Sequence, residues 1–190
     1  MNTTTRAAIA VVCTAALVAA AVLGGSYLGL AAPLSGDLYD TASVPGATQV
    51  ESPYGSASVW YDEAGVPHID AENEEALYFA VGYVQARDRL FQMDLQRRLV
   101  GGKLSALVGE STLESDRFYR SLDFQGAAEA SWQSVRGTDV GGPIEAFTDG
   151  VNHYAGTGPL PPEYALLDAE FEAWTPTDTL LVGKLISWQL

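Results

Sequence analysis

A group of charged and amide side chains falls within one long predicted helix, over residues Glu74 to Leu99. From Leu77, steps of three and four residues reach only apolar positions except at Asp88, which therefore interrupts an apolar stripe. A carboxylate taken out of water is costly unless it is paired and hydrogen-bonded, so we expect Asp88 to be buried with a fixed partner. Arg89, Gln92 and a neighbouring backbone group are the candidate partners.

Further charges of the same helix stand at pairing distance along its surface. Asp94 can meet Arg97 and Arg98, which follow it by three and four residues. A chemical role for Asp88 or Arg89 requires a nearby nucleophile or a second carboxylate that converges on them, and the sequence offers neither. We therefore interpret the set as a buried polar network that fixes helix packing. Its members are Asp88, Arg89, Gln92, Asp94, Arg97 and Arg98.

Two histidine–carboxylate pairs have spacings that could place both side chains on one face. His68 and Asp70 stand two apart on a predicted strand. Asp149 and His153 stand four apart on a predicted helix. Neither pair has an evident third ligand, so we interpret His68 as a structural edge residue and the helical pair as a hydrogen bond or charge pair, with a metal site as the alternative. An acidic segment, interpreted as solvated, contains Asp168, Glu170 and Glu172. No serine has the Gly-x-Ser-x-Gly context of a nucleophile elbow, so these residues alone give no complete active site.

The predicted elements are one β-hairpin followed by helices. An alternating run from Ser58 to Asp62 predicts a strand, and Val66 to Ile69 predicts its partner across a tight turn. The long helix follows, with Asn73 as its N-cap. Further helices are predicted over residues 103–108, 111–122, 125–135, 142–156 and 175–190, whereas residues 33–50 are read as a tether or irregular structure. The fold class is therefore mostly α with a short β-hairpin. The last helix is capped and apolar up to Leu190, which leads us to expect a truncated chain.

Charge and cysteine content exclude several classes of protein. With 24 acidic and 10 basic residues the formal net charge is −14, and such a surface repels nucleic acid. The single cysteine, Cys13, lies in the apolar leader, so no intrachain disulfide, cysteine metal site or thiol nucleophile is expected in the folded part. We therefore expect no nucleic-acid partner and no cofactor or metal held by this chain.

The N-terminus has the composition of a targeting or anchoring segment. No charge occurs between Arg6 and Asp37, and residues 7–23 are almost purely apolar. This segment suits either a signal peptide or a membrane-spanning helix. With Arg6 on the inner side, the rest of the chain is expected outside. We divide the chain into residues 1–36, a signal peptide or membrane anchor plus linker with its membrane contact over residues 7–32, and residues 37–190, an exported region that is membrane-anchored or secreted.

Several motifs, taken in order, resemble those of the penicillin acylase family. The first match reads VWYDEAGVPHIDAENEEALYFAVGYVQARDRLFQMDLQRRLVGGKLSALVG and is similar to the family pattern RDxxGVPHIxA…GYxxAxDRLxQMxxxRRxxxGxLAExxG. Later matches are ESDRFYRSLDF, which contains Asp116 and Arg120, then FTDGVNHY, LPPEY and AWTPTDTLLVGKL. The resemblance covers about Val50 to Leu190. Tyr61 replaces the usual basic residue, and Ser105 falls within the usual LAE stretch.

This resemblance implies an N-terminal nucleophile hydrolase with an α+β (αββα) fold, made as an exported precursor that cuts itself into α and β chains. The serine at the start of the β chain attacks an amide, its own α-amino group serves as base, and β-chain groups stabilise the oxyanion. The implied substrates are small amides of β-lactam antibiotics or N-acyl homoserine lactones. This chain would be the front of the α chain, partnered by the β chain of the same precursor and inactive alone.

The resemblance places no catalytic residue and no metal ligand in this chain. The nucleophile and the family's α-chain calcium ligand are expected beyond Leu190, so calcium is an expectation for the full-length protein only. Carrying the family pattern forward from Trp174 and Asp178 places Ser187 and Leu190 near the wall of the acyl pocket. The rival interpretation, from a different class, is a membrane-tethered, non-catalytic helical interaction module.

Overall fold

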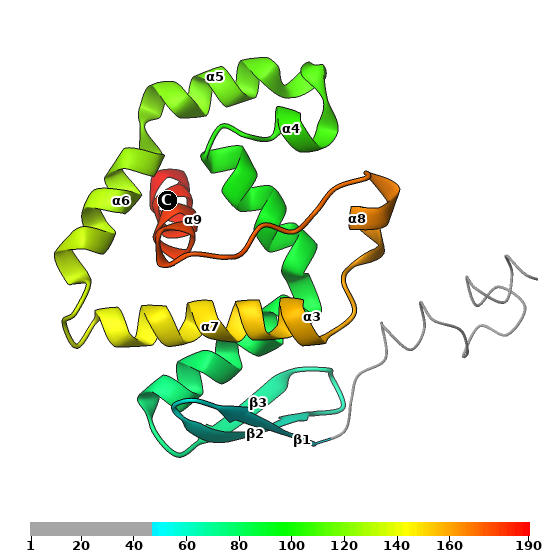
Figure 1. The fold of residues 1–190 in the computed structure, drawn as a ribbon, viewed down its shortest axis with the longest axis vertical. Helices are drawn as coiled ribbons and strands as arrows, with labels where there is room; N and C mark the ends of the chain where they lie inside the picture. The colour runs from blue at the N-terminus through cyan, green and yellow to red at the C-terminus, as the bar shows by residue number, and fades with distance from the viewer. Residues whose placement is uncertain (1–46) are drawn as a thin grey trace, which may run out of the picture. The chain divides into compact units, whose positions relative to one another are not determined.

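Three antiparallel strands open the part of the chain that the computed structural model describes, residues 47–190 (Figure 1). They are β1 (Thr48–Ser52), β2 (Gly55–Tyr61) and β3 (Pro67–Ala71), in the order β1-β2-β3. The predicted hairpin is confirmed as β2 and β3, paired through Val59 and Ile69. The reading of residues 33–50 as a tether or irregular structure is wrong for residues 48–50. They pair with β2 because Val50 can then bury its side chain on the same face as Val59.

The long predicted helix is present as α3 (Glu74–Val100). The Asn73 side chain accepts a hydrogen bond from the backbone N–H of Ala76 at 2.8 Å, which satisfies one of the free donors of the first turn. Acidic residues occupy that turn and arginines the last one, as the helix dipole favours. The helix is kinked at Arg89, where φ is −146° and ψ is 20°.

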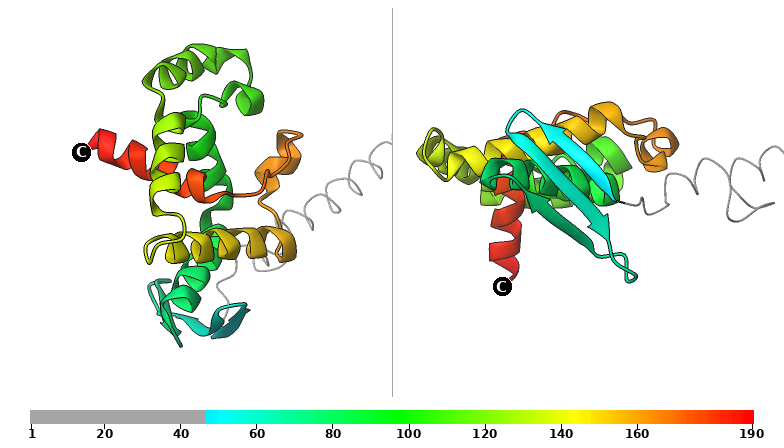
Figure 2. Two further views of the ribbon diagram at one scale, coloured as in Figure 1. Left: turned by 60° about the vertical axis from the view of Figure 1, so that its left-hand side comes forward. Right: turned by 90° about the horizontal axis from the view of Figure 1, so that it is seen from below.

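The remaining helices build a layer around α3. They are α4 (Ser105–Val108), a 3₁₀ turn η1 (Glu110–Thr112), α5 (Leu113–Leu122), α6 (Phe124–Val135), α7 (Gly141–Thr157), α8 (Pro162–Leu166) and α9 (Pro176–Gln189). Figure 1 shows α7 crossing α3 between the sheet and α9. Helix α9 packs on α6 and α3, and Figure 2 shows its C-terminal end projecting from the other helices. The mostly helical fold class with a small sheet is confirmed.

Apolar side chains form three buried clusters along α3. The first joins the sheet to α3 and α7, the second joins the middle of α3 to α7, α8 and Trp174, and the third joins the end of α3 to α6 and α9. Because every cluster includes residues of α3, this helix is the spine on which the other elements pack.

Two glycines allow α3 and α7 to cross closely. A Cβ added at Gly82 would overlap the carbonyl oxygen of Phe147, and a Cβ at Gly150 would overlap the carbonyl oxygen of Phe79. Each glycine therefore faces the backbone of the other helix. This reciprocal contact gives a physical reason for the glycines at position 82, in the first family motif, and at position 150, in the motif FTDGVNHY.

The leader lies outside the described residues, so the expected membrane contact over residues 7–32 and the division at residue 36 remain predictions. Within residues 47–190, the helices are too short or too polar for any of them to cross a bilayer.

Candidate functional site

A buried ion network forms where the second half of α3 meets the segment before α9. Asp94 is fully buried and its carboxylate accepts hydrogen bonds from Arg97 Nε at 2.7 Å and Arg98 Nε at 3.0 Å. The Tyr164 hydroxyl donates to its other oxygen at 3.0 Å. Burial, followed by the charge of Asp94, raises the pKa of Tyr164 far above its usual value, so this hydroxyl stays a donor. The carboxylate is therefore fully satisfied inside the protein.

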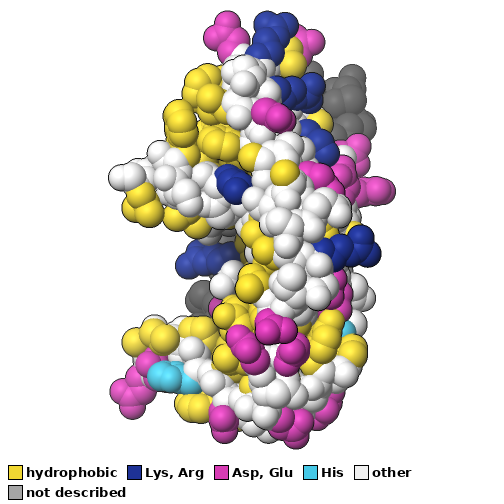
Figure 3. All heavy atoms as spheres, turned by 90° about the vertical axis from the view of Figure 1, so that its left-hand side faces the viewer, with side chains coloured by type: hydrophobic (Ala, Val, Ile, Leu, Met, Phe, Trp, Pro, Cys, Tyr) yellow, Lys and Arg dark blue, Asp and Glu magenta, His cyan; other side chains and the backbone are white. Residues whose placement is uncertain are grey.

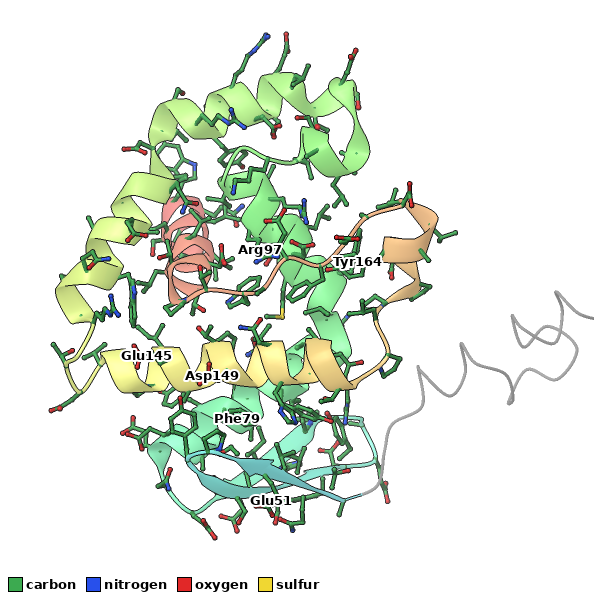
Figure 4. All side chains as sticks on the ribbon, in the orientation of Figure 1. Glu51, Phe79, Arg97, Glu145, Asp149 and Tyr164 are labelled. Atoms are coloured by element: carbon green, nitrogen blue, oxygen red, sulfur yellow. The ribbon has the colours of Figure 1, made fainter. Side chains whose placement is uncertain are left out.

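Arg97 holds the segment before α9 in place. Its guanidinium donates to the carbonyl oxygens of Ala173 at 3.2 Å and Glu172 at 2.5 Å, and it pairs with Asp178 at 3.2 Å. Its Cζ atom also lies over the rings of Phe171 and Trp174, at 5.1 and 5.0 Å from their centroids. Figure 4 shows Arg97 beside Tyr164, which belongs to α8. Among the described residues no buried side-chain nitrogen or oxygen lacks a hydrogen-bond partner, and the contacts of Arg97 join α3 to the segment before α9, so we interpret them as structural.

The prediction that Asp88 is buried is wrong. It was expected to be buried with Arg89 or Gln92, but 36% of its side chain is exposed and it pairs with Arg87 at 2.8 Å. The hydroxyl of Tyr61 approaches it at 3.4 Å, and Arg89 and Gln92 lie exposed at the surface.

Helical spacing gives the physical reason. The buried residues of α3 are Ala76, Phe79, Ala80, Gly82, Val84, Ala86, Leu90, Asp94, Arg97 and Val100. The stripe that continues into the second half of the helix runs through Ala86, Leu90 and Asp94 in four-residue steps. Asp88 is two residues from both Ala86 and Leu90, so it lies on the opposite side of the helix. Of the six predicted network residues, the structure brings together Asp94, Arg97 and Arg98 and leaves the other three outside.

The two histidine–carboxylate pairs lie in separate environments. His68 stacks on Trp60 with ring centroids 5.5 Å apart, and its Nε2 lies 3.2 Å from the carboxylate of Asp62, not of Asp70. Asp149 accepts a hydrogen bond from Tyr54 at 2.7 Å, and this bond ties the sheet to α7. Within residues 47–190, no three side chains of the His, Cys, Asp or Glu type gather to hold a metal.

A second carboxylate centre was missed by the network prediction. Asp116 is 3% exposed and accepts hydrogen bonds from the N–H of Leu104 at 2.8 Å and from the N–H of Ser105 at 3.0 Å. The Ser105 hydroxyl also donates to it, at 2.5 Å. Burial opposes the charge, but these hydrogen bonds, with the charge of Arg120, lower the pKa of Asp116 overall. The motif match at Asp116 was the available signal, although nothing in its local spacing identified the partners.

The predicted pocket-wall residues lie at the projecting end of α9. Ser187 and Leu190 are both exposed, and the Ser187 hydroxyl donates to the carbonyl oxygen of Gly183 at 3.0 Å. Their role in an acyl pocket remains a prediction.

Beside them, a groove of about 320 Å³ follows one side of α9, which we call the α9 groove. It is lined by Gln85, Met93, Gln96, Phe147, Trp174, Thr179, Val182, Gly183 and Ile186. In the space-filling view, the side from which α9 projects is hollowed (Figure 3). An apolar groove of this kind suits the binding of a partner or ligand rather than bond chemistry.

A family model described as penicillin amidase matches residues 56–190. The chain is 36% identical over 153 residues to the penicillin acylase 2 proenzyme of Pseudomonas sp. strain SE83, a match over 80% of this chain and 18% of that protein. It is 33% identical over 177 residues to the acyl-homoserine lactone acylase QuiP of Pseudomonas aeruginosa, over 90% of this chain and 21% of that protein. The chain thus spans about a fifth of the length of these curated relatives.

A solved structure gives a likeness in three dimensions. The thermostable penicillin G acylase from Alcaligenes faecalis superposes with a TM-score of 0.61 at 28% sequence identity, over 71% of this chain and 70% of that chain. The likeness therefore extends over most of both chains, in contrast to the small share of the proenzyme that is matched.

Proposed function

This chain belongs to the penicillin amidase family, and from that membership we propose that it is the N-terminal part of an exported amidohydrolase that cleaves a linear amide. The observation that carries the proposal is the family match across residues 56–190, supported by identity to acylases named for penicillin and for acyl-homoserine lactones. The substrate is a β-lactam with an amide side chain or an N-acyl homoserine lactone. Both have an acyl group joined through an amide to an amino group that is carried on a small ring, so one catalytic arrangement suits both.

The nucleophile lies outside this chain in our proposal. Within residues 47–190, the buried carboxylates Asp94 and Asp116 each accept three hydrogen bonds from the protein, with both oxygens of each engaged, so we assign them structural roles. The catalytic serine belongs to a β chain released from the same precursor. The α-amino group of that serine acts as base, and oxyanion donors of the β chain stabilise the charge that develops on the amide oxygen. The word proenzyme in a relative's name is consistent with a processed precursor.

The chain's own contribution is packing and part of the pocket wall. Ile186 and Trp188 on α9 are 55% and 59% exposed, which is a large apolar surface at the end of one helix. Such surface suits burial against a partner. We infer that the partner is the β chain, with Ser187 and Leu190 on the same helix end near the acyl group. The apolar leader supports export of the precursor.

The test is to express the complete coding sequence and to assay the purified product. We expect two chains by mass spectrometry, a serine at the new N-terminus of the second, and release of a carboxylic acid from penicillin G or from an N-acyl homoserine lactone. Replacing that N-terminal serine by alanine or cysteine should abolish or strongly reduce the release. A single uncut chain that hydrolyses neither amide contradicts the proposal.

A further inference from the structure

The buried guanidinium of Arg97 joins α3, the segment before α9 and α9 itself (Figure 4). Its Nε donates to the carboxylate of Asp94 on α3. Its two terminal nitrogens donate to the carbonyl oxygens of Glu172 and Ala173 and to the carboxylate of Asp178. An arginine can serve partners on several sides at once because its five N–H donors spread from a rigid plane. Arg97 therefore fixes the start of α9 to α3 in a defined geometry.

Asp178 connects this contact to the first turn of α9. Its carboxylate closes the capping box with Thr175 and also accepts the hydrogen bond from Arg97, at 3.2 Å. A carboxylate is favourable at the positive end of a helix dipole and a guanidinium is not, so the carboxylate allows the guanidinium to lie there. The side chains of Arg97 and Asp178 are 7% and 17% exposed, so solvent screens their attraction little. A displaced guanidinium therefore displaces the first turn of α9.

The first turn of α9 is held from two helices. Arg97 of α3 holds Asp178, and Glu129 of α6 accepts a hydrogen bond from the neighbouring Thr177 at 3.0 Å. Farther along, α9 contacts α6 through an apolar cluster, and apolar contacts do not fix a direction. If the contact with α3 is loosened, α9 can therefore turn about its contact with α6.

The length of α9 enlarges any change at its first turn. Ser187 follows Asp178 by nine residues, so the two lie about 14 Å apart along the helix axis. Figure 2 shows this C-terminal end projecting from the other helices. A tilt of about 8° at the first turn moves Ser187 by about 2 Å over that length.

We propose that Arg97 is a positioning residue for the acyl pocket: it sets the tilt of α9, and through that tilt the length of acyl chain that the enzyme prefers. The proposal rests on the proposed function, which places Ser187 and Leu190 near the acyl group. A change of one methylene group in an apolar pocket alters kcat/KM by about 10- to 200-fold. A pocket wall that moves by about 2 Å should therefore change the chain-length preference measurably.

The first experiment compares acyl chains on one leaving group. The full-length parent, Arg97→Lys and Arg98→Lys are assayed with the p-nitroanilides of butanoic, octanoic and dodecanoic acid. Lysine keeps the charge but has its three donors on one nitrogen, so it cannot serve Asp94, the two carbonyl oxygens and Asp178 together. Arg98→Lys is the matched control, because Arg98 also pairs with Asp94, whereas its other contacts are with Glu170 and Glu172, before α9.

The quantity compared is the ratio of kcat/KM for the longest and the shortest acyl chain. We expect this ratio to change at least about tenfold in Arg97→Lys and to stay at the parent value in Arg98→Lys. A merely structural role would lower kcat/KM for all three chains together and leave the ratio unchanged. An unchanged ratio in Arg97→Lys, or the same change in Arg98→Lys, overturns the proposal.

A second variant removes the other partner of the contact. Asp178→Asn keeps a side-chain oxygen for the cap at Thr175 but loses the charge that pairs with Arg97. It should shift the ratio in the same direction as Arg97→Lys, and the double variant should shift it by less than the sum of the two, because both changes act on one contact. Independent, additive shifts contradict the proposal. If Arg97→Lys yields no mature enzyme, Asp178→Asn decides, and a parent ratio in that variant overturns the proposal.

A distance measurement reads the tilt of α9 without hydrolysis. Spin labels at Ser187 on α9, paired with a label at Glu145 on α7 or at Arg117 on α5, occupy exposed positions. Double electron–electron resonance on the full-length precursor should show at least one of these separations changed by about 2 Å in Arg97→Lys and neither changed in Arg98→Lys. Parent separations in Arg97→Lys overturn the proposal. A parent protein that hydrolyses no amide refutes the proposed function instead, and the separations remain measurable in it.

Discussion

The crossing of α3 and α7 gives the sharpest stability prediction, the substitution Gly82→Ala. A Cβ at Gly82 would overlap the carbonyl oxygen of Phe147 and lie 3.0 Å from its carbonyl carbon. The obstacle is backbone in the middle of a helix, so it cannot rotate away as the end of a flexible side chain can. The two helices would have to separate by about 1 Å to restore ordinary contacts.

That separation sets the size of the loss in the free energy of unfolding. A gap of 0.5–1 Å removes about a quarter to a half of each dispersion contact across an interface, and overpacking a close-packed core costs about 1–3 kcal/mol. The α3–α7 contact is the most extensive between two elements, and it buries Phe79, Ala80 and Val151, so the upper end applies. Alanine gains back about 1 kcal/mol of helix propensity. The free energy of unfolding should therefore fall by about 2 kcal/mol.

The assay is urea unfolding followed by circular dichroism, with Gly156→Ala as the matched control. A Cβ at Gly156 meets nothing within 4 Å, so this variant should gain about 0.5–1 kcal/mol from helix propensity alone. The two alanine substitutions should thus shift stability in opposite directions, with a melting temperature lower by about 4–8 °C for Gly82→Ala than for the parent. A Gly82→Ala protein as stable as the parent or more so would refute the close-packing argument.

Three further outcomes follow from the polar contacts. Asp94→Asn should lower the free energy of unfolding by about 3 kcal/mol in urea, because it leaves the buried guanidinium of Arg97 short of a charge partner. Asp88 is exposed, so Asp88→Asn should change that free energy by less than about 1 kcal/mol. Equal effects of the two substitutions would contradict the assignment of the network to Asp94. The pKa of Asp116 lies below its ordinary 3.8, so the contribution of this carboxylate to folding stability is present above pH 3.8 and is lost as the pH falls through the lowered pKa. Asp116→Asn should therefore make the loss of stability at acid pH less steep. The same acid dependence in the variant and the parent would contradict this contribution. Burial and then a hydrogen bond to the Asp149 carboxylate raise the pKa of Tyr54 from 10.0 to about 12. The unfolded chain therefore loses the Tyr54 proton first, and the stability of the folded protein should fall between about pH 10 and 12. Tyr54→Phe should make this fall of the melting temperature with pH shallower, and an identical fall in the variant and the parent would exclude a contribution from Tyr54.

Local sequence signals predicted most of the helices and one hairpin. The N-cap at Asn73 and the capping box at Thr175 and Asp178 are both formed, since a cap depends on residues within one turn of each other. The pairing of Asp94 with Arg97 and Arg98 followed from helical spacing for the same reason.

Contacts between distant segments could not be read in the same way. Strand β1 has its partner in β2, and only that pairing distinguishes it from an irregular tether. The partners of Asp116 at Leu104 and Ser105 lie across a turn that no periodicity encodes. The groove lined by α3, α7 and α9 has no signature in any one of its three segments.

The sequence by itself determined the family, through motifs in order, and the identity of the long helix, through its caps and apolar run. It could not determine which carboxylate of that helix is buried. Helical spacing allows two stripes, one through Val84 and Asp88 and one through Ala86, Leu90 and Asp94. The apolar residues around α3 do not choose between them. The folded structure does, because Tyr164 and the segment before α9 pack on the side of Asp94, whereas Asp88 stays partly exposed and pairs with Arg87.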